Sequence, residues 1–182
     1  SPTAAKPQGT LRVAWGNFGT ERVYPDGNNT GIATAYGVYE GLVNLDANGM
    51  TVPMLAERWE SSPDAKIWTL YLRTGVQFHD GWGEFTAENV KFSIEEGSIK
   101  GSENDRLVLW KSEMASIEIV NPYQVRLNFK QGYVAVVADC SPARGSIIMI
   151  PKKYVEAVGK EKAALNPIGT GPYKFIDHKI GE

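Results

Sequence analysis

Residues 67–94 constrain the fold of this chain more than any other stretch. Over residues 67–72 two sets of side chains alternate at period two, Ile67, Thr69 and Tyr71 with Trp68, Leu70 and Leu72. This period predicts a strand with one face on a core. Asp80 and Gly81 then predict a turn, because glycine tolerates the positive φ that tight turns often require. The next residues predict a helix that begins after Thr86.

The start of this predicted helix carries two local signals. Thr86 can cap the helix by accepting the backbone N–H of Asn89. Phe85 and Val90 have the spacing of a hydrophobic staple. Asn89 stands where a capping box has Glu or Gln, so we expect the reciprocal half of the box to be weaker.

The composition is that of an ordinary globular protein and argues against nucleic-acid binding. The 182 residues are 42% hydrophobic and 22% charged, with a formal net charge of −2. This length is enough for one sizeable core, and the scattered basic residues give no electrostatic case for nucleic acid. No apolar run approaches the roughly 20 residues of a membrane-spanning helix. Residues 1–9 lack an apolar signal segment, which we interpret as a processed or engineered terminus.

The rest of the chain predicts alternating strands, turns and helices. A first strand over residues 10–15 leads into a polar loop over residues 16–29. Apolar residues at helical spacing from residue 32 predict a helix that Gly41 ends. Further expected elements are strands at residues 42–45 and around 51–53, a core segment at 56–59, a hairpin with its turn at 121–122, a short apolar element at 133–139, a helix from 151 to 158, and a strand beginning at 173–176.

No combination of residues points to catalysis. His79 and Asp80 could form a metal pair, but the second histidine is His178, so no His-rich metal site assembles and the turn interpretation is preferred. Residues 169–171 lack the Lys of a phosphate loop. Cys140, the only cysteine, is expected to be a small buried side chain. We therefore expect a protein without enzymatic activity, cofactor or metal.

Four segments stand in a fixed order: residues 55–60 (LAERWE), 68–73 (WTLYLR), 75–81 (GVQFHDG) and 85–90 (FTAENV). Together they closely resemble the signature of the family 5 extracellular solute-binding proteins, the peptide and nickel class of ABC-importer receptors. The chain departs from the family pattern at residues 82–84 and at Asn89. Local differences are therefore expected in the turn and in the helix cap.

The resemblance implies a mixed α/β fold of the periplasmic-binding-protein type II class. The chain would be a fragment of the N-terminal lobe, with a mixed sheet and an inserted β-rich subdomain. Residues 1–44 would form the first segment of this lobe, residues 45–165 the inserted α+β subdomain, and residues 166–182 the return strand toward the lobe. The resemblance covers about the first third of a family member, so we expect the second lobe and the hinge to lie outside this chain.

The resemblance also implies candidate ligand-binding residues in the loop after the first strand, which in the family reaches the cleft between the lobes. These candidates are Asn17, Phe18, Thr20, Glu21 and Tyr24. The alternative is a solvated surface loop. Glu40 could be a cleft acid, but a carboxylate on a helix surface or at a cap is the preferred interpretation.

Two further candidates are Trp110 and Arg144, which resemble the Trp and Arg with which nickel-binding members hold an anionic chelated ligand. An Arg side chain can pair bidentately with a carboxylate, and an indole face can cover an apolar or cationic group. The alternatives are a core position for Trp110 and a surface ion pair for Arg144.

Two functions from different classes are expected. The resemblance implies the substrate-binding component of an ABC importer, which captures a peptide, metal chelate or similar small solute and docks on a membrane permease. Its location would be periplasmic or extracellular, with or without a lipid anchor, and a partial lobe would bind poorly alone. The alternative is a self-associating or protein-interaction module, because apolar surface left by a missing lobe would seek a partner.

Overall fold

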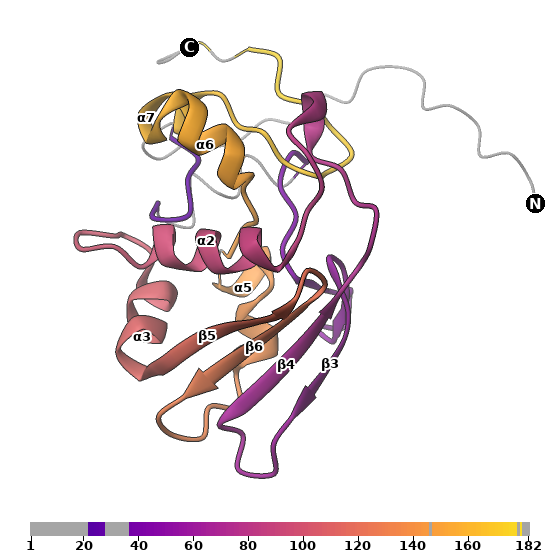
Figure 1. Cartoon of the computed structure of the whole chain (residues 1–182), viewed down its shortest axis with the longest axis vertical. Coiled ribbons are helices and arrows are strands. Elements are labelled where there is room, and N and C mark those ends of the chain that lie inside the picture. The colour runs from indigo at the N-terminus through magenta and orange to yellow at the C-terminus, as the bar shows by residue number, and fades with distance from the viewer. Residues whose placement is uncertain (1–21, 28–36, 146, 178, 180–182) are drawn as a thin grey trace, which may run out of the picture.

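The structure, a computed structural model, describes residues 22–27, 37–145, 147–177 and 179. Its strands are β1 (Val43–Leu45), β2 (Thr51–Pro53), β3 (Ala56–Ser61), β4 (Ile67–Leu72), β5 (Met114–Asn121) and β6 (Gln124–Phe129). Its helices are η1 (His79–Gly81), α2 (Ala87–Gly97), α3 (Asp105–Glu113), α4 (Val136–Asp139), α5 (Pro142–Gly145), α6 (Lys152–Val158) and α7 (Lys160–Leu165). Helix α2 lies between the large sheet and the α6–α7 pair (Figure 1).

The large sheet has the strand order β3-β4-β6-β5, and a separate two-stranded sheet joins β1 to β2. Every pairing among the described residues is antiparallel, with Leu70 of β4 opposite Val125 of β6. The predicted strand at residues 67–72 and the hairpin that turns at residues 121–122 are confirmed. The first strand that the sequence predicts, residues 10–15, lies outside the described residues.

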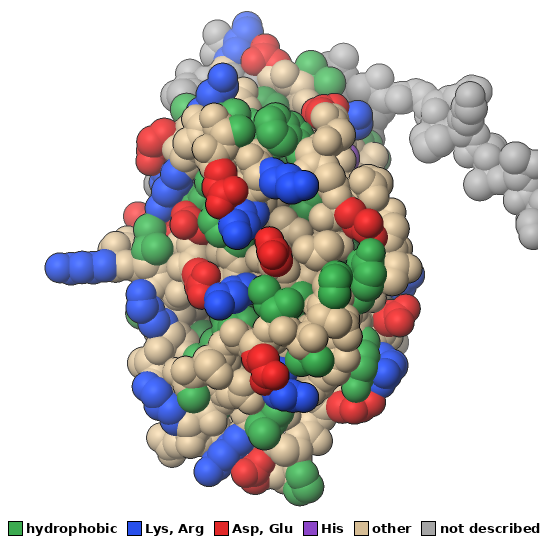
Figure 2. Space-filling view, viewed as in Figure 1, with side chains coloured by type: hydrophobic (Ala, Val, Ile, Leu, Met, Phe, Trp, Pro, Cys, Tyr) green, Lys and Arg blue, Asp and Glu red, His purple; other side chains and the backbone are tan. Residues whose placement is uncertain are grey.

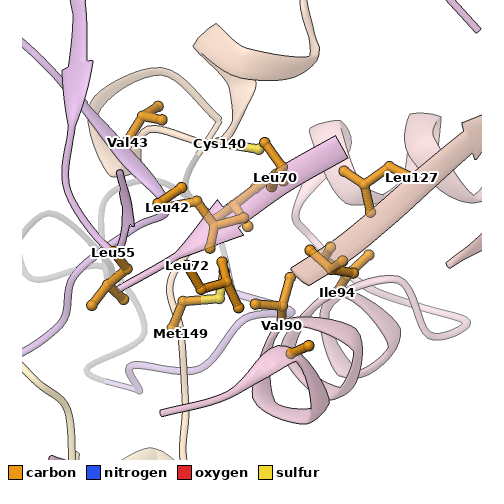
Figure 3. Packing of buried hydrophobic residues seen from close by; sticks show 14 of the residues in the cluster. Leu42, Val43, Leu55, Leu70, Leu72, Val90, Ile94, Leu127, Cys140 and Met149 are labelled. Carbon is orange, nitrogen blue, oxygen red and sulfur yellow. The ribbon is translucent and has the colours of Figure 1, made fainter. Parts of the chain in front are cut away.

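One face of the sheet is apolar because alternate residues of a strand point to the same side. Leu70 and Leu72 of β4 and Leu127 of β6 are almost completely buried. They pack against Val90 and Ile94 of α2 (Figure 3). We call these five side chains the sheet core. Burial of their apolar surface stabilises α2 on the sheet.

Helix α2 begins where the sequence predicts. Thr86 is its N-cap, and Oδ1 of Asn89 accepts the backbone N–H of Thr86 at 2.9 Å. Phe85 and Val90 are fully buried at the spacing of a hydrophobic staple. Asn89 therefore supplies the reciprocal half of the capping box in place of Glu or Gln.

The His-Asp-Gly turn joins two distant parts of the chain. Asp80 and Gly81 have φ angles of 56° and 75°, as the predicted turn requires. The backbone N–H of His79 donates to the carbonyl of Gly169 at 2.9 Å. Its ring Nε2 donates to the carbonyl of Gly171 at 2.8 Å, because a carbonyl oxygen can only accept. The turn interpretation of His79 is confirmed.

Residues 82–84, where the sequence departs from the family pattern, are integrated into the fold. The ring of Trp82 lies 4.9 Å from that of Tyr154 in α6. The hydroxyl of Tyr123 donates to Oε1 of Glu84 at 2.8 Å. The departure therefore brings side chains that tie the turn to α6 and to the β5–β6 hairpin.

Residues 37–42 are not helical, so the helix predicted to end at Gly41 is wrong in its described part. The carbonyl of Glu40 accepts the backbone N–H of Met149 at 3.0 Å. A side chain at position 41 would meet the ring of Pro142 at 2.4 Å. Gly41 is thus required by a close approach, and these long-range contacts override the local helical spacing.

The strand predicted to begin at residues 173–176 is not formed by the described residues. The backbone N–H groups of Gly171 and Tyr173 donate to the carbonyls of Val38 and Gly37, at 2.8 and 2.9 Å. These two backbone hydrogen bonds hold residues 171–173 against residues 37–38, but they do not continue into a β-ladder.

Helix α6 is confirmed, since Pro151 precedes it and Gly159, with a φ of 84°, follows it. Helices α6 and α7 pack on a second apolar cluster, which we call the α6–α7 cluster. Its buried members are Val23, Tyr24, Tyr39, Ile148, Ile150, Tyr154, Val155, Ala163 and Ala164.

Candidate functional site

Three of the predicted ligand-binding residues are described by the structure: Tyr24, Trp110 and Arg144. The other four lie outside the described residues: Asn17, Phe18, Thr20 and Glu21. Trp110 and Arg144 meet at one buried carboxylate, that of Asp139. Tyr24 belongs to the α6–α7 cluster and is not part of this meeting point.

Tyr24 is almost completely buried, with 1% of its surface exposed. Its hydroxyl donates to Oε2 of Glu96 in α2 at 2.8 Å, and Nζ of Lys160 lies 5.2 Å from its ring centroid. Burial, reinforced by the hydrogen bond to Glu96, raises the pKa of Tyr24 well above its ordinary value. The phenol is therefore neutral and joins residues 22–27 to α2.

Trp110 lies on α3 and is fully buried. Its ring packs edge-to-face on Phe129 with the centroids 5.6 Å apart, and its Nε1 donates to Oδ2 of Asp139 at 3.3 Å. This is the core position that the sequence left open as an alternative. The ligand-binding role of Trp110 stays a prediction, and the geometry of the described residues leaves the indole no exposed surface.

Asp139, at the end of α4, is the centre of a group that we call the Asp139 cluster. Oδ2 of this fully buried carboxylate accepts the hydroxyl of Tyr133 at 2.5 Å as well as the indole of Trp110. Oδ1 lies 3.4 Å from Nε of Arg106 and 4.0 Å from Nε of Arg144. A buried carboxylate needs this number of partners, because an unpaired buried charge is costly.

Both guanidinium groups of the Asp139 cluster reach solvent, and that of Arg144 is the more exposed. Its side chain is 57% exposed, against 35% for Arg106. Arg106 also donates from Nη1 to the hydroxyl of Tyr133 at 3.2 Å, so one more donor of its guanidinium is occupied. Arg144 approaches Asp139 through Nε, and its remaining donors are available to an external carboxylate.

Sequence reasoning missed Asp139, Arg106 and Tyr133. The three residues lie on α4, α3 and the segment before α4, and no local spacing relates α3 to the other two. The apolar segment at residues 133–139 was predicted, and a lone Asp at its end was the only available signal.

A groove runs beside β1 and is formed by two adjoining pockets of about 360 and 100 Å³ that share Asn44 and Met54. We call it the β1 groove. The larger pocket is lined by Glu40, Asn44, Val52, Pro53, Met54, Leu55, Arg73 and Val76. The smaller is lined by Tyr39, Asn44, Met54, Pro142 and Ala143. Glu40 therefore faces a pocket, and the described part of its segment is not the helix that the preferred interpretation assumed.

The described residues contain no group of three or more His, Cys, Asp or Glu side chains placed to hold a metal ion. No helix within them has the length and apolar character needed to cross a membrane. On the face shown in Figure 2, basic and acidic side chains are interspersed and no large basic patch forms.

The fold matches that of solved solute-binding proteins. NikZ from Campylobacter jejuni, solved with Ni(L-His), superposes with a TM-score of 0.76 and is 34% identical over 88% of this chain and 32% of NikZ. NikA from Brucella suis, solved with Fe(III)-EDTA, gives 0.70 and 34% identity over 83% of this chain and 30% of NikA. The chain thus has the α/β architecture of a type II periplasmic binding protein and corresponds to part of it.

Residues 51–182 match the family model described as "Bacterial extracellular solute-binding proteins, family 5 Middle". The chain therefore belongs to the family 5 bacterial extracellular solute-binding proteins. The glutathione-binding protein GsiB of Salmonella typhimurium is 33% identical over 159 residues, which are 87% of this chain and 30% of GsiB. The chain thus spans about a third of the length of the relatives it matches.

Proposed function

We propose that this chain is the N-terminal part of the substrate-binding component of an ABC importer, which captures a small solute between two lobes. Its family membership supports this function. The proposed solutes are a peptide, a metal chelate or a similar small molecule, and the proposed partner is a membrane permease. The proposed location is periplasmic or extracellular.

The observation that carries the choice of ligand group is the arrangement at Arg144. A fully buried carboxylate, Asp139, lies 4.0 Å from the Nε of Arg144 while most of that side chain stays exposed. The buried carboxylate keeps a guanidinium near it, and most of that guanidinium side chain remains open to a ligand. Arg144 would therefore hold an acidic group of the solute.

The test uses a protein that carries this chain together with its second lobe. Arg144→Ala should weaken binding of an acidic solute by about 1.5–3 kcal/mol, the contribution of a charged hydrogen bond. Isothermal titration calorimetry measures the change. Arg58→Ala is a matched control, because the Arg58 side chain is 54% exposed and Arg144 is 57% exposed. Unchanged affinity after Arg144→Ala would remove this residue from the site.

The same titration tests whether the interlobe cleft is needed. The chain by itself offers part of the contacts, so its affinity for the solute should fall far below that of the two-lobed protein. Equal affinity of the two proteins would contradict capture between lobes.

A further inference from the structure

Glu40 and Arg73 carry opposite charges on the lining of the larger pocket of the β1 groove. Among the described residues, neither side chain forms an ion pair. Elsewhere in the chain such side chains do pair, as in Arg126 with Glu118 at 2.9 Å. Both residues line a pocket of about 360 Å³ and are accessible to solvent, so one ligand in the pocket could contact both charges.

Backbone hydrogen bonds fix the spacing of the chain segments that carry the two charges. The N–H of Leu55 donates to the carbonyl of Gly41 at 3.3 Å, and the N–H of Arg73 donates to the carbonyl of Leu55 at 2.9 Å. Three chain segments thus lie side by side, and each such step is about 4.8 Å. The backbones that carry Glu40 and Arg73 are therefore roughly 10 Å apart, with Leu55 between them.

Both ends of the pocket are held in place. The carbonyl of Glu40 is bonded to Met149 at 3.0 Å, which fixes its backbone. Nε of Arg73 donates to the carbonyl of Met54, which orients the guanidinium and leaves its two Nη groups for a ligand. An arginine side chain held in this way binds with less loss of side-chain freedom.

The lining between the charges is apolar with one amide. Val52, Pro53, Leu55 and Val76 form apolar walls. Oδ1 of Asn44 accepts the backbone N–H of Leu45 at 2.9 Å, so the amide nitrogen of Asn44 can donate to a ligand. Apolar walls with a few placed polar groups, at this volume, are typical of small-molecule sites.

We infer that the β1 groove binds a small zwitterion whose ammonium group pairs with Glu40 and whose carboxylate pairs with Arg73. A purely anionic ligand would place its charge beside Glu40, and a purely cationic ligand would place its charge beside Arg73. Repulsion of the wrong charge therefore selects a dipolar ligand. The spacing selects one whose charges are several ångströms apart.

This site does not depend on the Asp139 cluster or on a second lobe, so it can be tested in the chain by itself. The probes are ω-amino acids of increasing length: glycine, β-alanine, 4-aminobutanoate and 6-aminohexanoate. Backbone amide shifts in two-dimensional NMR spectra report where each probe binds and how tightly. Shifts should gather at residues 40–44, 52–55 and 73–76, with glycine the weakest binder. N-acetylation or amidation of the best probe should weaken it at least tenfold.

Substitutions complete the test. Glu40→Gln and Arg73→Gln should each weaken the best probe at least tenfold while amide shifts outside the groove stay unchanged. Glu60→Gln and Arg58→Gln, which alter a charge pair on β3, should leave binding unchanged. The inference is overturned by equal binding of free and blocked probes, by shifts outside the groove, by an absence of shifts, or by full binding to either groove variant. Those results would leave the role proposed for Arg144 untouched.

Discussion

The sheet core and the Asp139 cluster are both buried, but they are stabilised in different ways. In the sheet core, Leu70 and Leu127 contact other apolar side chains (Figure 3), and the stabilisation scales with apolar area. In the Asp139 cluster, a carboxylate is buried together with two hydrogen-bond donors and two guanidinium groups. Oδ1 of Asp139 has no hydrogen-bond partner among the described residues. The stability of the cluster therefore depends on the nearby guanidinium charges as well as on the hydrogen bonds to Oδ2, because a buried polar group without a partner is destabilising.

Trp110 joins the Asp139 cluster to the large sheet. Its ring packs on Phe129 at the end of β6, and its N–H donates to Asp139. One residue type that combines a large apolar surface with a single donor is suited to such a boundary. The comparison shows that burial alone does not tell how a side chain stabilises the fold. Substitutions therefore have to separate the loss of buried apolar area from the loss of a hydrogen-bond or charge partner.

The largest effect is expected in the sheet core. Leu70→Ala should lower the free energy of unfolding by about 2–5 kcal/mol, because it removes apolar contacts and leaves a cavity. Urea unfolding measures the change. The control is Ile67→Ala in the same strand, where the side chain is 42% exposed and the loss should be about 0.5 kcal/mol. Equal losses at the two positions would contradict the packing of β4.

A smaller loss is expected when the acceptor of the Asp139 cluster is removed. Asp139→Ala should cost about 1–3 kcal/mol, because Trp110 and Tyr133 lose the partner of a buried donor. The two arginines are partly exposed, so solvent limits the cost of their lost pairing. Asp139→Asn, which keeps one acceptor oxygen, should cost less. If Asp139→Ala unfolds in urea at the same midpoint as the wild-type protein, packing alone stabilises this region.

Trp110→Phe tests the boundary between the two regions. It keeps an aromatic ring beside Phe129 and removes one donor, so we expect a loss of about 0.5–1.5 kcal/mol. The double variant with Asp139→Ala should be non-additive by at least about 0.5 kcal/mol, since the two residues share a hydrogen bond. Strict additivity in urea unfolding would mean that this hydrogen bond contributes nothing.

The smallest effect concerns Cys140, which follows Asp139 and is fully buried as predicted. Burial raises the pKa of the Cys140 thiol, so the thiolate forms more readily in the unfolded chain. At pH values below the ordinary thiol pKa of about 8.5, the contribution of Cys140 to the free energy of unfolding is constant. Above this pKa the free energy of unfolding falls as the pH rises.

By pH 9 this loss should be less than about 1 kcal/mol. Cys140→Ala should remove it, and unfolding curves at several pH values compare the two proteins. Rapid reaction of the folded protein with Ellman's reagent would contradict the burial on which this prediction depends.

Local signals predicted much of the fold. The alternation in β4, the Thr86 start of α2 and the Pro151 start of α6 each depend on a few neighbouring residues. The segment at residues 37–42 was predicted incorrectly because its backbone bonds to residues beyond the range of local spacing, from Leu55 to Tyr173. The candidate site was predicted in part: Trp110 and Arg144 were named, and Asp139, which joins them, was not.

The sequence by itself determined the family, the strand and helix positions with strong periodicity, and the turns that need glycine. Only the tertiary structure decided that Trp110 faces Asp139, that Arg144 keeps an exposed guanidinium, and that Glu40 and Arg73 share a pocket. The physical reason is the distance along the chain over which each interaction acts. Periodicity and capping act between residues a few positions apart, whereas charge pairing and pocket formation depend on which distant segments the packed core brings together.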